Sequence, residues 1–76
     1  MMTTNLKEIL QVLALNMNEE WVRGLGEVLT DYEEERNWRF DCYDATCKCF
    51  IFICREGAER AVERKYVMHE LMRRLD

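Results

Sequence analysis

Four cysteines lie close together in the middle of the chain, and they are the residues with the clearest potential for chemistry. Their spacing is C-x4-C-x-C-x4-C, formed by Cys42, Cys47, Cys49 and Cys54. Four thiolates can hold zinc tetrahedrally at Zn–S distances of about 2.3 Å, but structural zinc sites usually take pairs of cysteines from tight turns. Here Cys47 and Cys49 fall on a predicted strand, and Cys54 has the opposite parity, so its side chain points to the other face. We therefore interpret the four as reduced, apolar side chains that bind no cofactor, and keep a small zinc-binding domain as the alternative function.

Residues that could carry catalysis are sparse. His69 is the only histidine, and no nucleophile with an orienting third group stands at a spacing that would pair with it. The chain contains no glycine-rich phosphate loop, no G-x-S-x-G motif and no H-E-x-x-H motif. We predict that the protein is not an enzyme.

Acidic residues form a stripe along the second predicted helix, roughly opposite its apolar side. The stripe and its C-terminal extension comprise Glu20, Glu27, Asp31, Glu33, Glu34 and Glu35. Carboxylates near a helix C-terminus face the negative end of the helix dipole and are unfavourable by about 0.3–1 kcal/mol each. One interpretation is a solvated face that keeps the protein soluble. The other, which we adopt, is a docking surface for a basic patch on another protein.

Arg64 falls within the apolar stripe of the last predicted helix, one turn before Met68. Its long stem could cover apolar surface while its guanidinium reaches water. The alternative is an ion pair, either with the acidic helix or with a partner protein.

Composition and charge narrow the possible classes of protein. The chain has 76 residues, is 49% hydrophobic and carries a net charge of −4, which predicts one small folded domain spanning residues 1–76. The negative charge disfavours direct binding to nucleic acid or to an anionic membrane. The longest apolar run, residues 49–54, is far shorter than the roughly 20 residues that a membrane span needs. The N-terminus lacks the features of a signal peptide, so we expect a cytoplasmic protein with reduced thiols.

The spacing of apolar residues predicts helices over residues 5–16, 18–36 and 56–75. Asn5 and Asn18 are suited to cap the first two, because an asparagine side chain can accept a hydrogen bond from a free N–H of the first turn.

Alternating apolar and polar residues predict a β-hairpin over residues 38–54, with its turn at Asp44–Ala45. A two-residue turn would place Cys42 opposite Cys47 and Phe40 opposite Cys49.

The order helix, helix, strand, strand, helix predicts an α+β fold in which helices pack on a two-stranded antiparallel ribbon. The return strand is apolar on both faces, with Phe50 and Phe52 on one and Ile51 and Ile53 on the other. A two-stranded sheet is not stable alone, and helices of this size cannot cover both faces. We therefore predict a homodimer that completes the core.

Together these features predict a small, non-enzymatic intracellular protein that uses its acidic helix to bind a larger, basic protein and to modulate or inhibit it. The larger protein is one that could handle nucleic acid, since such proteins carry basic patches. This combination is the general style of accessory proteins of phages and mobile elements, a likeness of type that rests on no motif.

Overall fold

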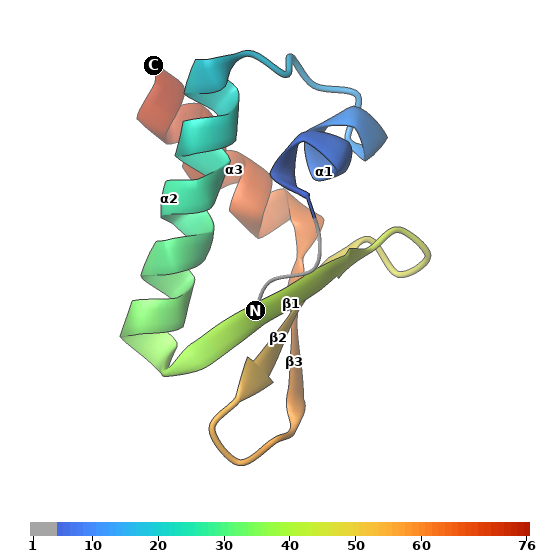
Figure 1. Ribbon diagram of the computed structural model, residues 1–76, viewed down its shortest axis with the longest axis vertical. Coiled ribbons are helices and arrows are strands. Elements are labelled where there is room, and N and C mark those ends of the chain that lie inside the picture. The colour runs from blue at the N-terminus through green and yellow to red at the C-terminus, as the bar shows by residue number, and fades with distance from the viewer. Residues whose placement is uncertain (1–4) are drawn as a thin grey trace.

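The chain forms an α+β fold in which the helices lie on one face of an antiparallel sheet (Figure 1). The computed structural model describes residues 5–76. Within that range the elements, in order, are α1 (Leu6–Val12), α2 (Glu19–Arg36), β1 (Trp38–Asp44), β2 (Cys49–Cys54), β3 (Glu59–Glu63) and α3 (Arg64–Leu75). The strands pair in the order β1-β2-β3. The α+β prediction is confirmed, but the described sheet has three strands instead of the two in the predicted ribbon.

α2 begins and ends where local sequence features place it. Asn18 is its N-cap, and the Asn18 side-chain oxygen accepts a hydrogen bond from the Trp21 N–H at 3.0 Å. The helix ends at Asn37, which takes a left-handed conformation (φ 60°) that asparagine tolerates, and the Asn37 N–H donates to the Glu33 carbonyl. The predicted second helix is confirmed to within one residue.

α1 is shorter than the helix predicted for residues 5–16. Asn5 caps it as expected, because its side-chain oxygen accepts the Lys7 N–H at 2.8 Å. The helix ends at Val12, and the chain then passes through a positive φ of 58° at Ala14. A left-handed residue cannot continue a right-handed helix. Met17 therefore lies outside the helix and is 39% exposed.

The β1–β2 hairpin has a longer turn than predicted. Asp44 pairs with Cys49, which leaves residues 45–48 as the turn. The Asp44 side chain stabilises this turn by accepting a backbone N–H at 2.9 Å. A β-bulge between Phe40 and Cys42 adds an unpaired residue to β1 and shifts its alternation by one position.

The predicted register of the hairpin is wrong for these reasons. Phe40 faces Phe52 instead of Cys49, and Cys42 does not face Cys47. The prediction assumes that side chains alternate regularly between the two faces of the sheet. Such alternation cannot reveal a β-bulge, nor a longer turn that a side chain stabilises.

β3 occupies the segment where we predicted the start of the last helix. Gly57 takes a φ of 90°, and its N–H donates to the Cys54 carbonyl at 2.8 Å, so the chain reverses directly after β2. The strand then pairs along the edge of β2, which satisfies backbone groups that a two-stranded ribbon would leave bare. Ala61, which lies within the helix predicted for residues 56–75, is an exposed residue of this strand, and α3 begins only at Arg64.

The core lies between the helices and the inner face of the sheet, with Phe50 and Phe52 at its centre. Both side chains are 0% exposed, and the Phe52 ring lies 5.4, 5.6 and 6.0 Å from the rings of Phe40, Trp38 and Tyr32. The helices contribute Ile9, Leu10, Leu13, Leu25, Val28, Leu29, Val67 and Leu71. One chain therefore buries the two phenylalanines, and the part of the homodimer argument that rested on them is wrong. Dimerisation itself stays a prediction.

α2 and α3 cross closely at Gly24. A Cβ atom at this position would lie 3.0 Å from Leu71 Cδ1 and 3.5 Å from Leu75 Cδ2. The absence of a side chain thus lets the last turns of α3 approach α2. This crossing brings the C-terminal residues of α3 next to the acidic stripe.

None of the helices within residues 5–76 is both long enough and apolar enough to cross a membrane.

Candidate protein-binding surface on α2

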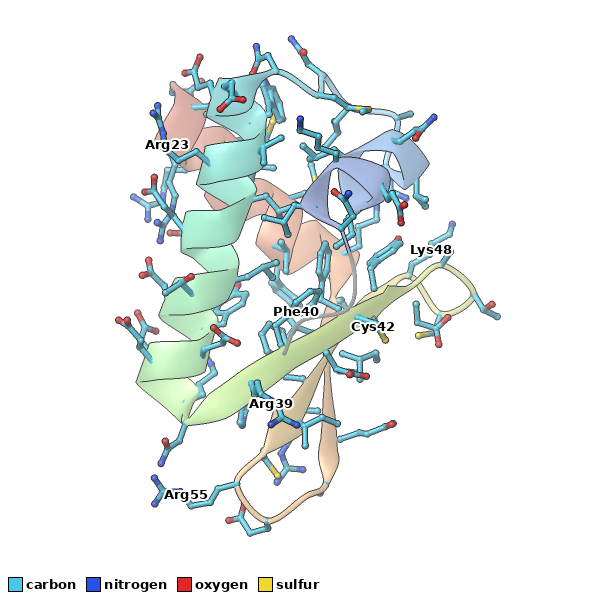
Figure 2. The ribbon with its side chains drawn as sticks, viewed as in Figure 1. Arg23, Arg39, Phe40, Cys42, Lys48 and Arg55 are labelled. Atoms are coloured by element: carbon cyan, nitrogen blue, oxygen red, sulfur yellow. The ribbon has the colours of Figure 1, made fainter. Side chains whose placement is uncertain are left out.

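The outward face of α2 carries the predicted acidic stripe. Glu20, Glu27 and Glu34 are exposed and succeed one another every seven residues, which is close to two helical turns. Figure 2 shows Arg23 projecting from the same helix away from the sheet. The structure therefore places acidic side chains on this surface, with at least one basic side chain among them.

A hollow of about 640 Å³ lies over this face of α2, bordered by α1, β1 and the end of α3. Its apolar lining includes Leu6, Leu29 and Phe40. The charged lining consists of four carboxylates and three guanidinium groups, from Glu27, Asp31, Glu33, Glu34, Arg23, Arg39 and Arg74. The surface thus combines an apolar floor with a mixed rim, in which carboxylates outnumber guanidinium groups by one.

Arg74 is the basic residue that reaches the acidic stripe. Its guanidinium forms an ion pair with Asp31, and it lies 3.9 Å from the Glu27 carboxylate and 3.6 Å from that of Glu70. The hydrogen bond to Asp31 raises the pKa of Arg74. Its Nε atom is buried and has no hydrogen-bond partner, so the guanidinium is held by its outer nitrogens alone. Glu27 and Asp31 are therefore partly neutralised within the chain.

Arg64, which we predicted as the ion-pair anchor, lies elsewhere. It is the first residue of α3, where its N–H donates to the Lys48 carbonyl at 2.9 Å. Its side chain lines a different hollow, next to Cys47 and Met68, and in the described part of the chain it forms no ion pair with α2. The helix begins eight residues later than predicted, which moves the pairing role to Arg74. The sequence did contain the indication, because Arg74 follows the buried Leu71 by three positions and so shares its helix face.

Glu33 has a structural partner. Its Oε2 atom accepts a hydrogen bond from the Phe40 N–H at 2.7 Å, so the carboxylate joins the last turns of α2 to strand β1. This contact accounts for an acidic residue near the unfavourable end of the helix dipole. Glu35 pairs with its neighbour Arg36 at 3.0 Å. Of the six predicted residues, Glu20 and Glu34 are the two with neither an ion pair nor a side-chain hydrogen bond within residues 5–76.

The cysteines are all free and do not converge on one point. Cys54 is buried on the inner face of β2, whereas Cys49 lies on the outer face and Cys47 is exposed in the turn. The Cys49 thiol donates to the Cys47 carbonyl at 3.3 Å. Partial burial and a hydrogen bond with Asp41 raise the pKa of Cys42, and desolvation together with Cys49 raises the pKa of Cys47. Residues 5–76 contain no group of three or more His, Cys, Asp or Glu side chains placed to hold a metal ion, so this arrangement gives the zinc alternative no support.

Comparison with known proteins adds no relative. No protein-family model matches the chain, and neither the curated proteins nor the solved structures contain a significant match.

Proposed function

We propose that this chain is a small, non-enzymatic protein-binding module that docks a basic segment of a larger protein on the outward face of α2. Docking would modulate or inhibit that larger protein. A reducing compartment such as the cytoplasm suits a chain with four free thiols.

The observation that carries this proposal is the ion pairing of Arg74. Its guanidinium is held among three carboxylates, those of Glu27, Asp31 and Glu70, on the surface that we assign to the partner. This internal contact between a guanidinium and carboxylates is the same kind of interaction that we expect between this surface and a basic partner segment. Guanidinium groups are well suited to such contacts, because their planar array of donors matches carboxylate oxygens.

Spacing along α2 suggests the shape of the partner segment. Glu20, Glu27 and Glu34 repeat every seven residues, which corresponds to roughly 10 Å along a helix. A partner helix with lysine or arginine at the same interval would meet all three carboxylates. Charges that are exposed before binding mainly accelerate association, so we expect binding to weaken as salt is added.

The test uses two matched double variants that change the net charge equally. Glu20→Lys with Glu34→Lys alters the proposed surface, and neither residue takes part in an ion pair in the described structure. Glu8→Lys with Glu56→Lys alters two exposed carboxylates on α1 and on the β2–β3 turn. Circular dichroism would show that both variants keep the fold.

Each chain is immobilised, exposed to lysate of its native source and washed at increasing salt, and retained proteins are quantified by mass spectrometry. We expect a basic protein that the wild type and the control variant retain equally and that the α2 variant retains about tenfold less. Equal retention by all three chains would overturn the assignment of the surface to α2.

A further inference from the structure

The face of the sheet opposite the helices carries no other element of the described chain. In Figure 1 the helices of the described chain lie on one side of the strands, and Figure 2 shows Phe40 on that side of β1, with Arg39 and Cys42 on the other. Burial along β2 alternates accordingly, since Phe50 and Phe52 are buried while Cys49, Ile51 and Ile53 are only half-buried. Within residues 5–76 no other element packs on this outer face.

The outer face is apolar at its centre. Its middle strand presents Cys49, Ile51 and Ile53, and β1 and β3 add Cys42 and Ala61 on either side of Ile51. An antiparallel sheet with one solvated face normally alternates apolar residues toward the core with polar residues toward water. β2 does not follow that rule, because its outer side chains are apolar as well. An apolar patch on a sheet face is typical of a surface that contacts another element or molecule.

The rim of this face is acidic. The register places Asp44 and Glu63 on either side of Cys49, and Glu59 beside Ile53. Asp41 lies at the bulge and hydrogen-bonds to Cys42.

Three of these carboxylates act on the Cys42 thiol. The pKa of Cys42 is raised first by burial and then by Asp41, Asp44 and Glu59. The one basic side chain in the paired rows of the described sheet that belongs to this face is Arg39. The outer face is therefore an apolar strip inside a negative border.

We infer that the outer face of the sheet docks an amphipathic helix of a partner protein, whose apolar stripe is flanked by lysine or arginine. The dimensions agree with such an occupant. The six residues of β2 extend for about 20 Å at roughly 3.3 Å per residue. A helix of about 13 residues has the same length, and its diameter of roughly 10 Å matches the width of three strands.

Two other occupants fit less well. A second copy of the chain, packed face to face, would bring two acidic rims together and create like-charge repulsion. Strand addition at an edge meets different obstacles, because Glu33 already occupies the Phe40 N–H on the β1 edge and the β3 edge is short and charged. The two faces share no carboxylate. Arg39 is common to both, because it borders the α2 hollow and stands beside Ile53 in the outer row of the sheet. The proposal depends on the apolar strip and its own carboxylates, not on those of the α2 surface.

The probe is a synthetic helical peptide with leucine at positions i, i+3, i+4 and i+7 and with lysine on both flanks. A matched peptide carries glutamate in place of lysine. Both are titrated into the isotope-labelled full chain that carries the Glu20→Lys and Glu34→Lys changes, which weaken capture of the lysine peptide by the acidic stripe of α2. We expect the lysine peptide to shift NMR signals of Ile51, Ile53 and Ala61, and the glutamate peptide to bind at least about tenfold more weakly.

Two variants identify the residues responsible. Replacing Ile51 and Ile53 by threonine keeps β-branched side chains in the strand while removing apolar surface, and we expect it to weaken peptide binding about tenfold. The control replaces Val12 and Met72 by threonine, because these are exposed apolar residues on α1 and α3 at 57% and 49%. This control should leave the affinity unchanged.

Several results would overturn the inference. These are absence of binding, equal binding of the two peptides, and signal shifts confined to the helices. A dimer in sedimentation that the threonine variant disperses would identify a second copy as the occupant instead. If the threonine variant fails to fold, the chain with intact isoleucines still tests the inference. The affinities of the two peptides and the positions of the shifted NMR signals then give the result. Loss of partner capture through α2 would leave all of these results unaffected.

Discussion

The outward face of α2 and the outer face of the sheet are both open to solvent, but they differ in how far their side chains are paired or covered by other parts of the chain. On α2 much of the charge is balanced from within, since Arg74 pairs with Asp31 and Glu33 accepts the Phe40 N–H. On the sheet Ile51 and Ile53 are half-buried, and no other element within residues 5–76 packs on the face that they share (Figure 1).

This difference follows from the physics of the two kinds of group. A neighbouring side chain can pair with an exposed carboxylate at little net change in free energy, typically about 0–1 kcal/mol. An apolar side chain leaves water only when another element or molecule covers it. For the two proposed surfaces, we therefore expect the charges on α2 to affect mainly the rate of association, and the apolar strip of the sheet to affect mainly the stability of a complex.

The two faces of β2 should respond very differently to the loss of an apolar side chain. We expect Phe52→Ala, on the covered face, to lower the free energy of unfolding by about 3–5 kcal/mol, because it leaves a cavity among aromatic rings. Ile51→Ala, on the uncovered face, should cost about 1 kcal/mol. Urea unfolding followed by circular dichroism measures both values.

Phe52→Leu serves as a milder variant if the alanine variant does not fold. Comparable losses at the two positions would show that something covers the outer face in the free protein. Since a second copy would be the available cover, the stability of the wild type would then depend on protein concentration.

The elements that sequence analysis predicted well are those defined by neighbouring residues. α2 combines an asparagine cap, acidic residues in its first turn and a regular apolar side, all within one segment. Each of these features depends on residues a few positions apart. They therefore predict the same helix whatever the rest of the fold is. The same holds for the Asn5 cap of α1.

The elements that were missed depend on contacts distant in sequence. Residues 59–63 have a composition compatible with a helix, and they become a strand because the edge of β2 is free to pair. Gly57 was the one local indication of a turn.

The candidate site shows the same limit. The acidic stripe on α2 could be predicted from helical spacing. Spacing also places Arg74 on the same helix face as Leu71, but it does not indicate that this face meets Asp31. Whether Arg64 or Arg74 reaches that carboxylate depends on where α3 starts, and β3 determines the start. Pairing within a helix is a local property, whereas pairing between helices requires the crossing at Gly24.

Glu33 and Glu34 offer a second test of the comparison, because they are adjacent acids with different surroundings. Glu33→Ala removes the acceptor of the Phe40 N–H and should lower the free energy of unfolding by about 1–2 kcal/mol. Glu34→Ala should change it by less than about 0.5 kcal/mol, because Glu34 is exposed and lies outside such contacts. Thermal unfolding gives both values.

Hydrogen exchange at the Phe40 amide distinguishes a lost hydrogen bond from a general loss of stability. The Phe40 N–H should exchange faster in Glu33→Ala than in a variant of equal stability altered elsewhere, and Glu33→Gln, which retains an acceptor oxygen, should restore part of its protection. Unchanged exchange at this amide would mean that Glu33 belongs with the free charges of the α2 face.

The smallest effect concerns Glu70, whose carboxylate joins the Arg73 and Arg74 side chains at the border of that face. A hydrogen bond from Arg73 lowers the pKa of Glu70 below its ordinary value of 4.5, and the nearby arginine charges add to the shift. Because the folded chain binds this proton more weakly than the unfolded chain, Glu70 stabilises the fold above pH 4.5 and loses that contribution as the pH falls through its lowered pKa.

Glu70→Gln should therefore reduce the melting temperature slightly at neutral pH and leave it unchanged in strong acid. Arg73→Gln should remove most of the same pH dependence, and adding Glu70→Gln to it should then change little. A difference between wild type and Glu70→Gln that persists unchanged into strong acid would show that the residue acts through packing, and would remove it from the set of charges that the α2 face balances internally.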